Sequence, residues 1–234
     1  MLLSVIIPNY NEEKTINSII NKVVKQKEFI DLEIIVVDDF SSDKSRELLK
    51  QLKLNGQIDN LILQDQNYGK GFAIQTALTK CLGDIVLIQD ADLEYDPTDY
   101  NSMLSIIKKK KLKCLYGSRV LGKNRYNQKN FTSLFRIFAN HFLTFLTNLI
   151  YDQKLSDAHT CYKMVNLKLI KSINLKEKRF AFCPELTAKL SKSGIKIEEC
   201  AISYKGRTYD EGKKINFFDG LAAIWVLLKY RFYD

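Results

Sequence analysis

Two carboxylates one residue apart stand directly after a short apolar run near the middle of the chain. The run Ile85–Ile88 predicts a buried strand, and Asp90 and Asp92 follow its end. Acidic side chains at such a position commonly hold a hard divalent cation, which in turn binds phosphate. The triplet is therefore interpreted as a metal–diphosphate clamp. The alternative is structural: Asp90 ends the strand, and Asp92 caps a helix that starts near Pro97.

Three further apolar runs are followed by helical patterns, which indicates strands that alternate with helices. They cover residues 2–8, 33–39 and 60–64; the second ends in Asp38 and Asp39, and the third precedes the segment NYGKG, where a helix begins. This alternation predicts an α/β fold with a doubly wound, mostly parallel sheet. Ligands of such sheets bind beyond the carboxyl ends of the strands, where these polar residues fall. Asp39 is expected to cap the turn that follows it.

The first half of the chain resembles the family-two glycosyltransferases of GT-A fold. The motifs that carry the resemblance are VIIPNYNEE, IIVVDDFSSD, NYGKG and QDADLEYDP. The second half is similar to the dolichol-phosphate mannose synthase branch, through the motifs GSR, SDAHTCYK, PELTAK and SYKGRTYDEGKK. Members of this branch move a sugar from a nucleotide donor to a polyprenyl phosphate. The resemblance extends from about Ser4 to about Tyr230 and therefore covers nearly the whole chain.

The resemblance implies a Rossmann-like GT-A fold with C-terminal amphipathic helices, in which residues 1–234 form a single glycosyltransferase domain. Residues 1–99 are expected to be the nucleotide-sugar and metal half, and residues 100–234 the acceptor half. The implied reaction is inverting and metal-dependent. It moves a sugar from a GDP-sugar or a UDP-sugar to a polyprenyl phosphate, either dolichyl or undecaprenyl phosphate.

The donor side needs charge neutralisation on the leaving diphosphate. A Mg²⁺ or Mn²⁺ ion held by Asp92, with Glu94 as a second or water-mediated ligand, would supply it as a Lewis acid. Lys70, between two glycines, either reaches phosphate or simply begins a helix. By resemblance, the other donor contacts are Asp90 with the ribose or with a diphosphate-bound metal, Asp38 with the edge of the base, and Pro8, Tyr10 and Glu12 around the base and ribose.

An ionised acceptor phosphate needs cations more than it needs a base. Arg119 and Arg207 match the phosphate-binding arginines of this branch, and a planar guanidinium binds phosphate oxygens through paired hydrogen bonds. Asp157 matches the acid near the acceptor, which orients the nucleophile or takes a proton; its alternative is a helix or turn cap. Glu185 matches a family carboxylate, whereas Cys183 stands where relatives often carry an acid.

Charge is divided unevenly along the chain. Residues 1–99 contain 10 basic and 17 acidic side chains, and residues 100–234 contain 26 and 10. An acidic half that holds a metal and a basic half that meets an anionic lipid fit this division. Nucleic acid is not expected as a partner, because no recognised nucleic-acid motif is present. Five cysteines without metal-site spacing indicate reduced thiols in a cytosolic protein, and the first residues predict a strand, so no signal peptide is expected.

Two segments place aromatic and apolar residues at helical spacing. One covers residues 131–150 and the other residues 217–232, close to Lys213, Lys214, Lys229 and Arg231. Polar residues interrupt the first segment, so we do not expect it to span a bilayer. The two stripes are interpreted either as core or homodimer faces, or as a surface that attaches the protein peripherally to the cytoplasmic face of a membrane.

The sequence leaves three functions open. The first is a polyprenyl-phosphate glycosyltransferase. The second is a soluble glycosyltransferase that acts on a sugar or protein hydroxyl, with Asp157 or Glu185 as the base. The third is a non-catalytic nucleotide-binding relative. The two arginines and the absence of acids between residues 100 and 151 favour the first over the second. The intact carboxylates at 90, 92 and 94 argue against the third, and the absence of a Gln-x-x-Arg-Trp motif argues against a processive polysaccharide synthase.

Overall fold

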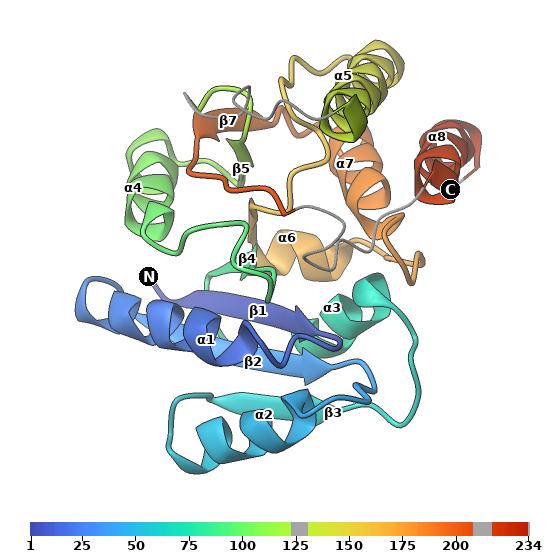
Figure 1. Cartoon of the computed structure of the whole chain (residues 1–234). Coiled ribbons are helices and arrows are strands. Elements are labelled where there is room, and N and C mark those ends of the chain that lie inside the picture. Colours follow the sequence, from blue (N-terminus) through green and yellow to red (C-terminus); the bar gives the residue numbers. More distant parts are fainter. Residues whose placement is uncertain (123–130, 208–216, 234) are drawn as a thin grey trace.

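The computed structural model describes residues 1–122, 131–207 and 217–233, with the backbone alone at 131–136 and 217. Strands and helices alternate along the first half of the chain, which confirms the predicted pattern (Figure 1). The elements in order are β1 (Leu3–Asn9), α1 (Ile16–Lys25), the 3-10 helix η1 (Gln26–Glu28), β2 (Leu32–Asp38), α2 (Ser45–Leu54), β3 (Asn60–Leu63), α3 (Lys70–Leu78), β4 (Ile85–Ile88), α4 (Asp99–Lys110), β5 (Cys114–Ser118), α5 (Phe131–Tyr151), β6 (Lys163–Asn166), α6 (Leu167–Ser172), α7 (Phe182–Lys192), β7 (Glu198–Ala201) and α8 (Phe217–Phe232).

One sheet joins strands from both halves of the chain. Its order is β3-β2-β1-β4-β6-β5-β7, and all neighbouring strands are parallel except where β6 pairs. β6 runs antiparallel to β4 and to β5. The prediction of a mostly parallel sheet is confirmed, whereas the reversed strand β6 was not anticipated. Because β6 is reversed, the loop that enters it lies at the same edge as the carboxyl ends of β1, β2 and β4.

Apolar side chains alternate between the two faces of the sheet, as the two-residue period of a strand requires. Val5 and Ile7 join a core that α1, α2 and α4 cover, while Ile6 and Val37 join a second core that α3, α6 and α7 cover. Burial of each large side chain contributes about 1.5–3 kcal/mol. Helices on both faces therefore fix the sheet and its edges as a rigid support.

The two C-terminal stripe helices pack at one side of the sheet, next to α7 (Figure 1). Tyr151 of α5 donates a hydrogen bond from its hydroxyl to the carbonyl oxygen of Leu227 in α8, at 2.7 Å. Tyr151, Leu227 and Tyr230 form a small buried cluster with Ala188 of α7. The inner faces of α5 and α8 thus form a third, smaller core together with α7.

The outer faces of these helices expose the predicted stripes. On each helix the exposed residues recur at helical spacing. Those of α5 are Phe138, Phe142, Phe145 and Leu149, and those of α8 are Phe218, Leu221, Trp225, Leu228 and Phe232. Trp225 is 64% exposed and Phe145 is 60% exposed, so the stripes are not core faces of this chain. Lys213 and Lys214 lie outside the described residues. Within the described part of the chain, no helix combines the length and the apolarity needed to cross a bilayer.

Candidate active site

Polar residues from four segments gather where β1, β2 and β4 end and β6 begins. Asn9 and Asp38 are register partners at the ends of β1 and β2, and the Asn9 amide donates to Asp38 Oδ1 at 2.8 Å. Asp38 is fully buried, and Arg46 Nε lies 3.2 Å from its second oxygen. Pro8 lies just before Asn9 on the same strand, and Tyr10 follows it with 37% of its surface exposed. The predicted base and ribose contacts therefore share one edge of the sheet.

Asp39 holds the loop before α3 and does not cap the turn that follows it. Its two carboxylate oxygens accept the backbone N–H groups of Tyr68 and Gly69, each at 2.8 Å. Gly69 has a φ of +97°, and a Cβ there would lie 2.6 Å from the carbonyl oxygen of Lys178. A side chain at this position would therefore both strain the backbone and clash. The expectation for Asp39 was wrong because its partner is about thirty residues away in sequence.

Lys70 and Asp90 form an ion pair at this edge. Lys70 Nζ contacts Asp90 Oδ1 and also lies 3.0 Å from the sulfur of Cys161. Burial by itself raises the pKa of Asp90, but the charge and hydrogen bond of Lys70, together with Cys161 and Arg207, outweigh it, so this pKa lies below its ordinary value. Both predicted phosphate-side residues are thus brought together and charged. The helix that Lys70 begins, α3, gives the ammonium its position, so the two alternatives considered for this residue are not exclusive.

Arg207 reaches across to three carboxylates of the donor side. Its Nη2 lies 2.8 Å from Asp92 Oδ2, its Nη1 lies 3.1 Å from Glu12 Oε2, and its backbone N–H donates to Glu94 Oε1 at 2.7 Å. Burial raises the pKa of Asp92 to about 7, repulsion from Asp90 and Glu94 adds to this rise, and Arg207 opposes it. The arginine therefore compensates only part of the negative charge gathered here.

These carboxylates suit a hard divalent cation. Among the described residues, no cluster of three or more His, Cys, Asp or Glu side chains forms a complete metal site. Mg²⁺ typically takes only one or two protein carboxylates and completes its shell with water and substrate phosphates. Asp92 and Glu94 match that smaller requirement, and a cation beside them would offset the burial and the repulsion from Asp90 and Glu94 that raise the pKa of Asp92. Any cation that binds them competes with Arg207.

Tyr204 connects the donor carboxylates to the acceptor-side arginine. Its hydroxyl donates to Glu94 Oε2 at 2.8 Å, and its ring lies 5.2 Å from the guanidinium carbon of Arg119. A cation over an aromatic face is attracted by the ring quadrupole. The Tyr204 side chain thus links Arg119 to Glu94, one of the two proposed metal ligands.

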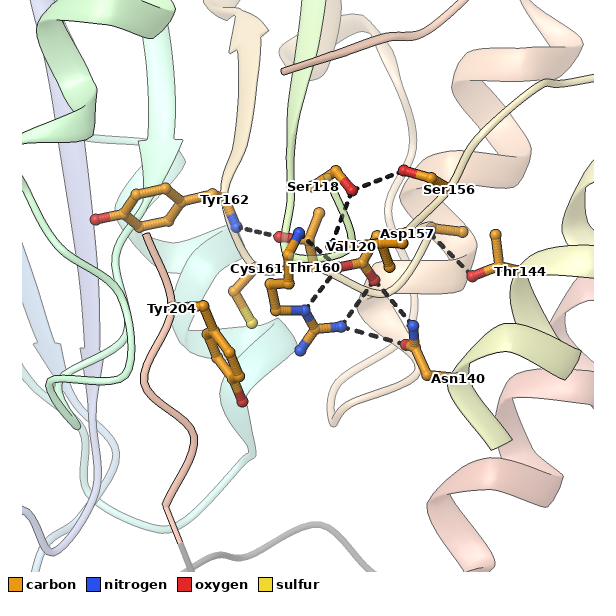
Figure 2. Close-up of polar contacts among 12 residues, drawn as sticks. Ser118, Val120, Asn140, Thr144, Ser156, Asp157, Thr160, Cys161, Tyr162 and Tyr204 are labelled. Carbon is orange, nitrogen blue, oxygen red and sulfur yellow. Dashed lines mark hydrogen bonds and ion pairs between the residues drawn. The ribbon is translucent and has the colours of Figure 1, made fainter. Parts of the chain in front are cut away.

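Asp157 holds Arg119 through two parallel hydrogen bonds, which Figure 2 draws as dashed lines between Asp157 and an unlabelled guanidinium group. Arg119 Nε lies 2.7 Å from Asp157 Oδ2, and Nη2 lies 2.8 Å from Oδ1. Asn140 of α5 bonds both groups, at 3.0 Å to Asp157 and 3.2 Å to Arg119 (Figure 2). Arg119 Nη1 makes no hydrogen bond to a described residue. Asp157 and Asn140 thus fix the orientation of the Arg119 guanidinium, including its Nη1 group.

Both carboxylates considered as bases are buried and engaged. Asp157 is fully buried, and Glu199 of β7 fixes its loop by accepting the backbone N–H groups of Ser156 and Asp157. Glu185 is also fully buried; its oxygens accept the N–H groups of Lys176 and Glu177 at 2.7 and 2.8 Å. Such contacts fix loops and occupy the carboxylate oxygens, which are the atoms that a general base would need for its substrate.

Sequence reasoning missed three residues of this site. Asn140 was visible as one polar residue in an aromatic stripe, which indicates a side chain with a buried polar partner. Tyr204 lay within a motif but had no assigned role. Cys161 is the third, and it carried no signal other than its place in the SDAHTCYK motif.

A family comparison identifies the family to which the chain belongs. The model of glycosyl transferase family 2 matches residues 4–173, so the chain belongs to this family. The matched segment contains Asp92, Arg119 and Asp157 and ends before the segment that carries Arg207.

Three curated relatives are 25–29% identical to this chain over the aligned residues. An undecaprenyl-phosphate 4-deoxy-4-formamido-L-arabinose transferase of Proteus mirabilis is 25% identical over 90% of this chain, which spans 62% of that relative's length. A dodecaprenyl-phosphate galacturonate synthase of Rhizobium johnstonii is 26% identical over 90% of this chain and 61% of its own length. A UDP-N-acetylglucosamine–dolichyl-phosphate N-acetylglucosaminyltransferase of Methanococcus voltae is 29% identical, with 97% of this chain and 95% of the relative covered.

Solved structures establish the GT-A fold. Glucosyl-3-phosphoglycerate synthase from Mycobacterium tuberculosis, in complex with Mn²⁺, UDP and glucosyl-3-phosphoglycerate, has a TM-score of 0.73 at 17% identity, and covers 100% of this chain and 81% of its own. Residues 1–349 of TarS from S. aureus, in complex with UDP-GlcNAc, have a TM-score of 0.65 at 18% identity, and cover 98% and 66%.

The raised pKa of Asp92 yields a stability test in the absence of cation and nucleotide. Because this pKa rises from 3.8 to about 7 on folding, the folded state binds the extra proton between these values, and stability falls as pH rises through that window. Asp92→Asn removes the penalty, so we expect it to raise the free energy of unfolding at pH 8 by about 1–3 kcal/mol and to have little effect near pH 4. Urea unfolding at both pH values measures this.

Asp96→Asn is the matched control of opposite sign. Burial alone would raise the pKa of Asp96, but hydrogen bonds from Thr98 and the charge of Lys22 together outweigh it and lower this pKa, so the ionised form of Asp96 stabilises the fold at pH 8. The asparagine variant should therefore lose stability there. A loss of stability for Asp92→Asn at pH 8 would contradict the proposed charge repulsion.

Proposed function

We propose that this chain transfers a sugar from a UDP-sugar to a polyprenyl phosphate at a membrane surface, with a divalent cation at Asp92 and Glu94. The observation that carries the proposal is the orientation of Arg119. Asp157 and Asn140 fix its guanidinium, and Nη1 keeps a donor group that no described residue uses. A guanidinium that is held through Nε and Nη2, with an Nη1 group that no described residue uses, suits a phosphate monoester.

The two arginines serve the acceptor phosphate in this proposal. Arg119 is already oriented for it, and Arg207 contacts Asp92 and Glu12. When a cation binds together with the donor diphosphate, it neutralises part of the negative charge of these carboxylates. The attraction that holds Arg207 there then weakens. Arg207 then exchanges carboxylate oxygens for phosphate oxygens, which need the same planar pair of N–H donors.

The bound cation would act as a Lewis acid on the leaving diphosphate. Asp92 and Glu94 hold it, Asp38 and Glu12 position the base and ribose, and Lys70 with Asp90 faces the phosphates. Asp157 acts through Arg119 and not as a base, because its oxygens already accept hydrogen bonds from Arg119 and Asn140. An ionised phosphate nucleophile fits this arrangement, since it needs no proton acceptor.

UDP is the proposed nucleotide. The relative from Methanococcus voltae is named for a UDP-sugar, and the similar solved structures contain UDP or UDP-GlcNAc. The named acceptors of three relatives are polyprenyl phosphates. The alternative of a hydroxyl acceptor is disfavoured by the engaged carboxylates of Asp157 and Glu185.

Peripheral attachment to the cytoplasmic face of a membrane completes the proposal. Its support is the exposed aromatic surface of α5 and α8, with the exposed Arg231 at its end. Free thiols at all five cysteines suit a reducing compartment. Aromatic side chains next to cations bind an anionic interface through apolar burial and charge together.

Transfer to lipid tests the function. Labelled sugar from a panel of UDP-sugars should enter the organic phase only with protein, polyprenyl phosphate and Mn²⁺ or Mg²⁺, and EDTA should abolish it. Asp92→Ala should lower the rate by roughly a hundredfold or more, because a metal contributes several kcal/mol to the transition state. Asp31→Ala, an exposed acid at the far end of β2, should behave as wild type. UDP binding without any transfer would support a non-catalytic relative instead.

Substitution of the two arginines tests the acceptor site. Arg119→Ala and Arg207→Ala should lower lipid-acceptor kcat/KM by roughly tenfold to a hundredfold, since a lost charged hydrogen bond costs about 1.5–3 kcal/mol, while UDP affinity changes less. Lysine should rescue poorly, because it offers one point charge in place of a planar pair of donors. Lys196→Ala, which removes an exposed ion pair, is the control. Wild-type transfer by both alanine variants would exclude the acceptor assignment.

Vesicle binding tests the exposed aromatic surface. The protein should sediment with phosphatidylglycerol-containing vesicles at low salt and less at high salt, because charge contributes. Trp225→Asp should weaken binding by roughly tenfold or more, as expected for loss of one buried aromatic side chain. Phe29→Asp is matched in exposure, at 67%, but lies far from both stripes in sequence, and should bind normally. The surface is a homodimer face if the protein does not bind vesicles, forms a dimer in solution, and becomes monomeric when Trp225→Asp is introduced.

A further inference from the structure

A buried glutamine holds the start of the loop that carries the proposed metal ligands. Gln89 directly precedes Asp90, and none of its surface is exposed. Its Oε1 accepts the hydroxyl groups of Tyr100 and Tyr162, each at 2.6 Å, and its Nε2 donates to the carbonyl oxygen of Asp90 at 2.9 Å. Both tyrosines are fully buried as well. The Gln89 amide therefore connects two phenol groups to the peptide group that follows Asp90.

The end of the same loop is held by one of these tyrosines. The rings of Tyr95 and Tyr162 are stacked, with centroids 4.7 Å apart and planes inclined by 23°. The Tyr95 hydroxyl also accepts the backbone N–H of Cys161, the residue before Tyr162, at 3.0 Å. Figure 2 shows the Tyr162 ring pointing away from Asp157. Tyr162 thus holds the loop at both ends, through a hydrogen bond to Gln89 and a ring contact with Tyr95.

The loop between these two ends has a strained backbone. Leu93 has a φ of +63°, in the left-handed region that residues with a Cβ rarely adopt. Beside it, the backbone N–H of Glu94 donates to Asp92 Oδ1 at 3.1 Å. Such strain persists only where the surrounding structure fixes the backbone. The anchors at Gln89 and Tyr95 meet this need, and they thereby keep the two proposed metal ligands next to each other.

A core built only for stability would not need polar groups at this place. Tyr100 and Tyr162 lie in the apolar core that α1, α2 and α4 cover. Apolar side chains of the same shape can replace a complete set of hydrogen-bonding partners at little cost in stability. They cannot fix the direction of a peptide group, whereas hydrogen bonds do so because they are directional. The polar network therefore has a use in orientation that stability does not explain.

We propose that Gln89 and Tyr162 are positioning residues for the metal site, because they hold the loop that presents Asp92 and Glu94 to a divalent cation. These roles rest on the proposed function, but only on its cation at Asp92 and Glu94. Gln89 and Tyr162 act through the loop and not as ligands. Groups that orient metal ligands typically contribute about 10-fold to 100-fold to metal affinity, which sets the size of the expected effect.

The test separates orientation from stability. Gln89→Met leaves two buried hydroxyl groups without their acceptor, so it should lower both the urea midpoint and the affinity for Mn²⁺. The triple variant Gln89→Met, Tyr100→Phe and Tyr162→Phe removes those hydroxyl groups too, so its urea midpoint should return toward the wild-type value. Its affinity for Mn²⁺ in the presence of UDP, measured by calorimetry, should stay roughly tenfold to a hundredfold weaker.

Two single variants complete the set. Tyr162→Phe keeps the ring contact with Tyr95 and loses only the hydroxyl, so it should weaken Mn²⁺ binding by a smaller factor than the triple variant. Tyr116→Phe is the matched control. Tyr116 is also fully buried and shares one hydroxyl hydrogen bond with Thr187, at 3.0 Å, but it belongs to the core on the other face of the sheet. This variant should bind Mn²⁺ as the wild type does.

The outcomes distinguish a failure of the positioning roles from a failure of the proposed function. If the triple variant regains wild-type affinity for Mn²⁺ together with its stability, the network serves stability alone and the positioning roles are wrong, while the proposed function stands. If the wild-type protein binds no Mn²⁺ in the presence of UDP, both are wrong. Normal Mn²⁺ binding without any sugar transfer to lipid would contradict only the proposed function.

Discussion

The site depends on basic side chains that neutralise the negative charge of several carboxylates at one edge of the sheet. Parallel strands that end together bring Asp38, Asp90 and Asp92 to the same edge of the sheet, and each of these buried or partly buried acids needs a cation. The protein supplies these cations from distant segments: Arg46 from α2, and Arg207 from beyond β7. The site therefore exists only when both halves of the chain are folded together, since neither half contains the full set of charges and countercharges.

Much of the fold was predictable because it depends on local pattern. The apolar runs that became β1, β2 and β4 were recognisable by composition alone, and the rule that ligands bind at the carboxyl ends of parallel strands located the site. Arg119 and Asp157 could be identified as important from motifs, but their mutual hydrogen bonds could not, because they are 38 residues apart.

What the sequence did not reveal are contacts that depend on tertiary structure. Asp39 was assigned to its own turn, since sequence reasoning favours near neighbours, but it binds the loop before α3. Arg207 was assigned to the acceptor alone, and its contacts with Glu12 and Asp92 arise only when the segment after β7 folds over the sheet edge. The antiparallel β6 is as short as β4, but it begins at Lys163 and ends at Asn166, so it lacks the continuous apolar run that identified β4.

The reversed strand β6 also sets how much length variation the chain tolerates. Its register pairs Met164 with Leu87 on one side and with Leu115 on the other, so both neighbours fix it at once. One residue inserted between Asp157 and Lys163 would have to bulge, or else slide β6 by about 3.3 Å and turn its inward side chains outward. Insertions in this loop should thus be selected against in homologues.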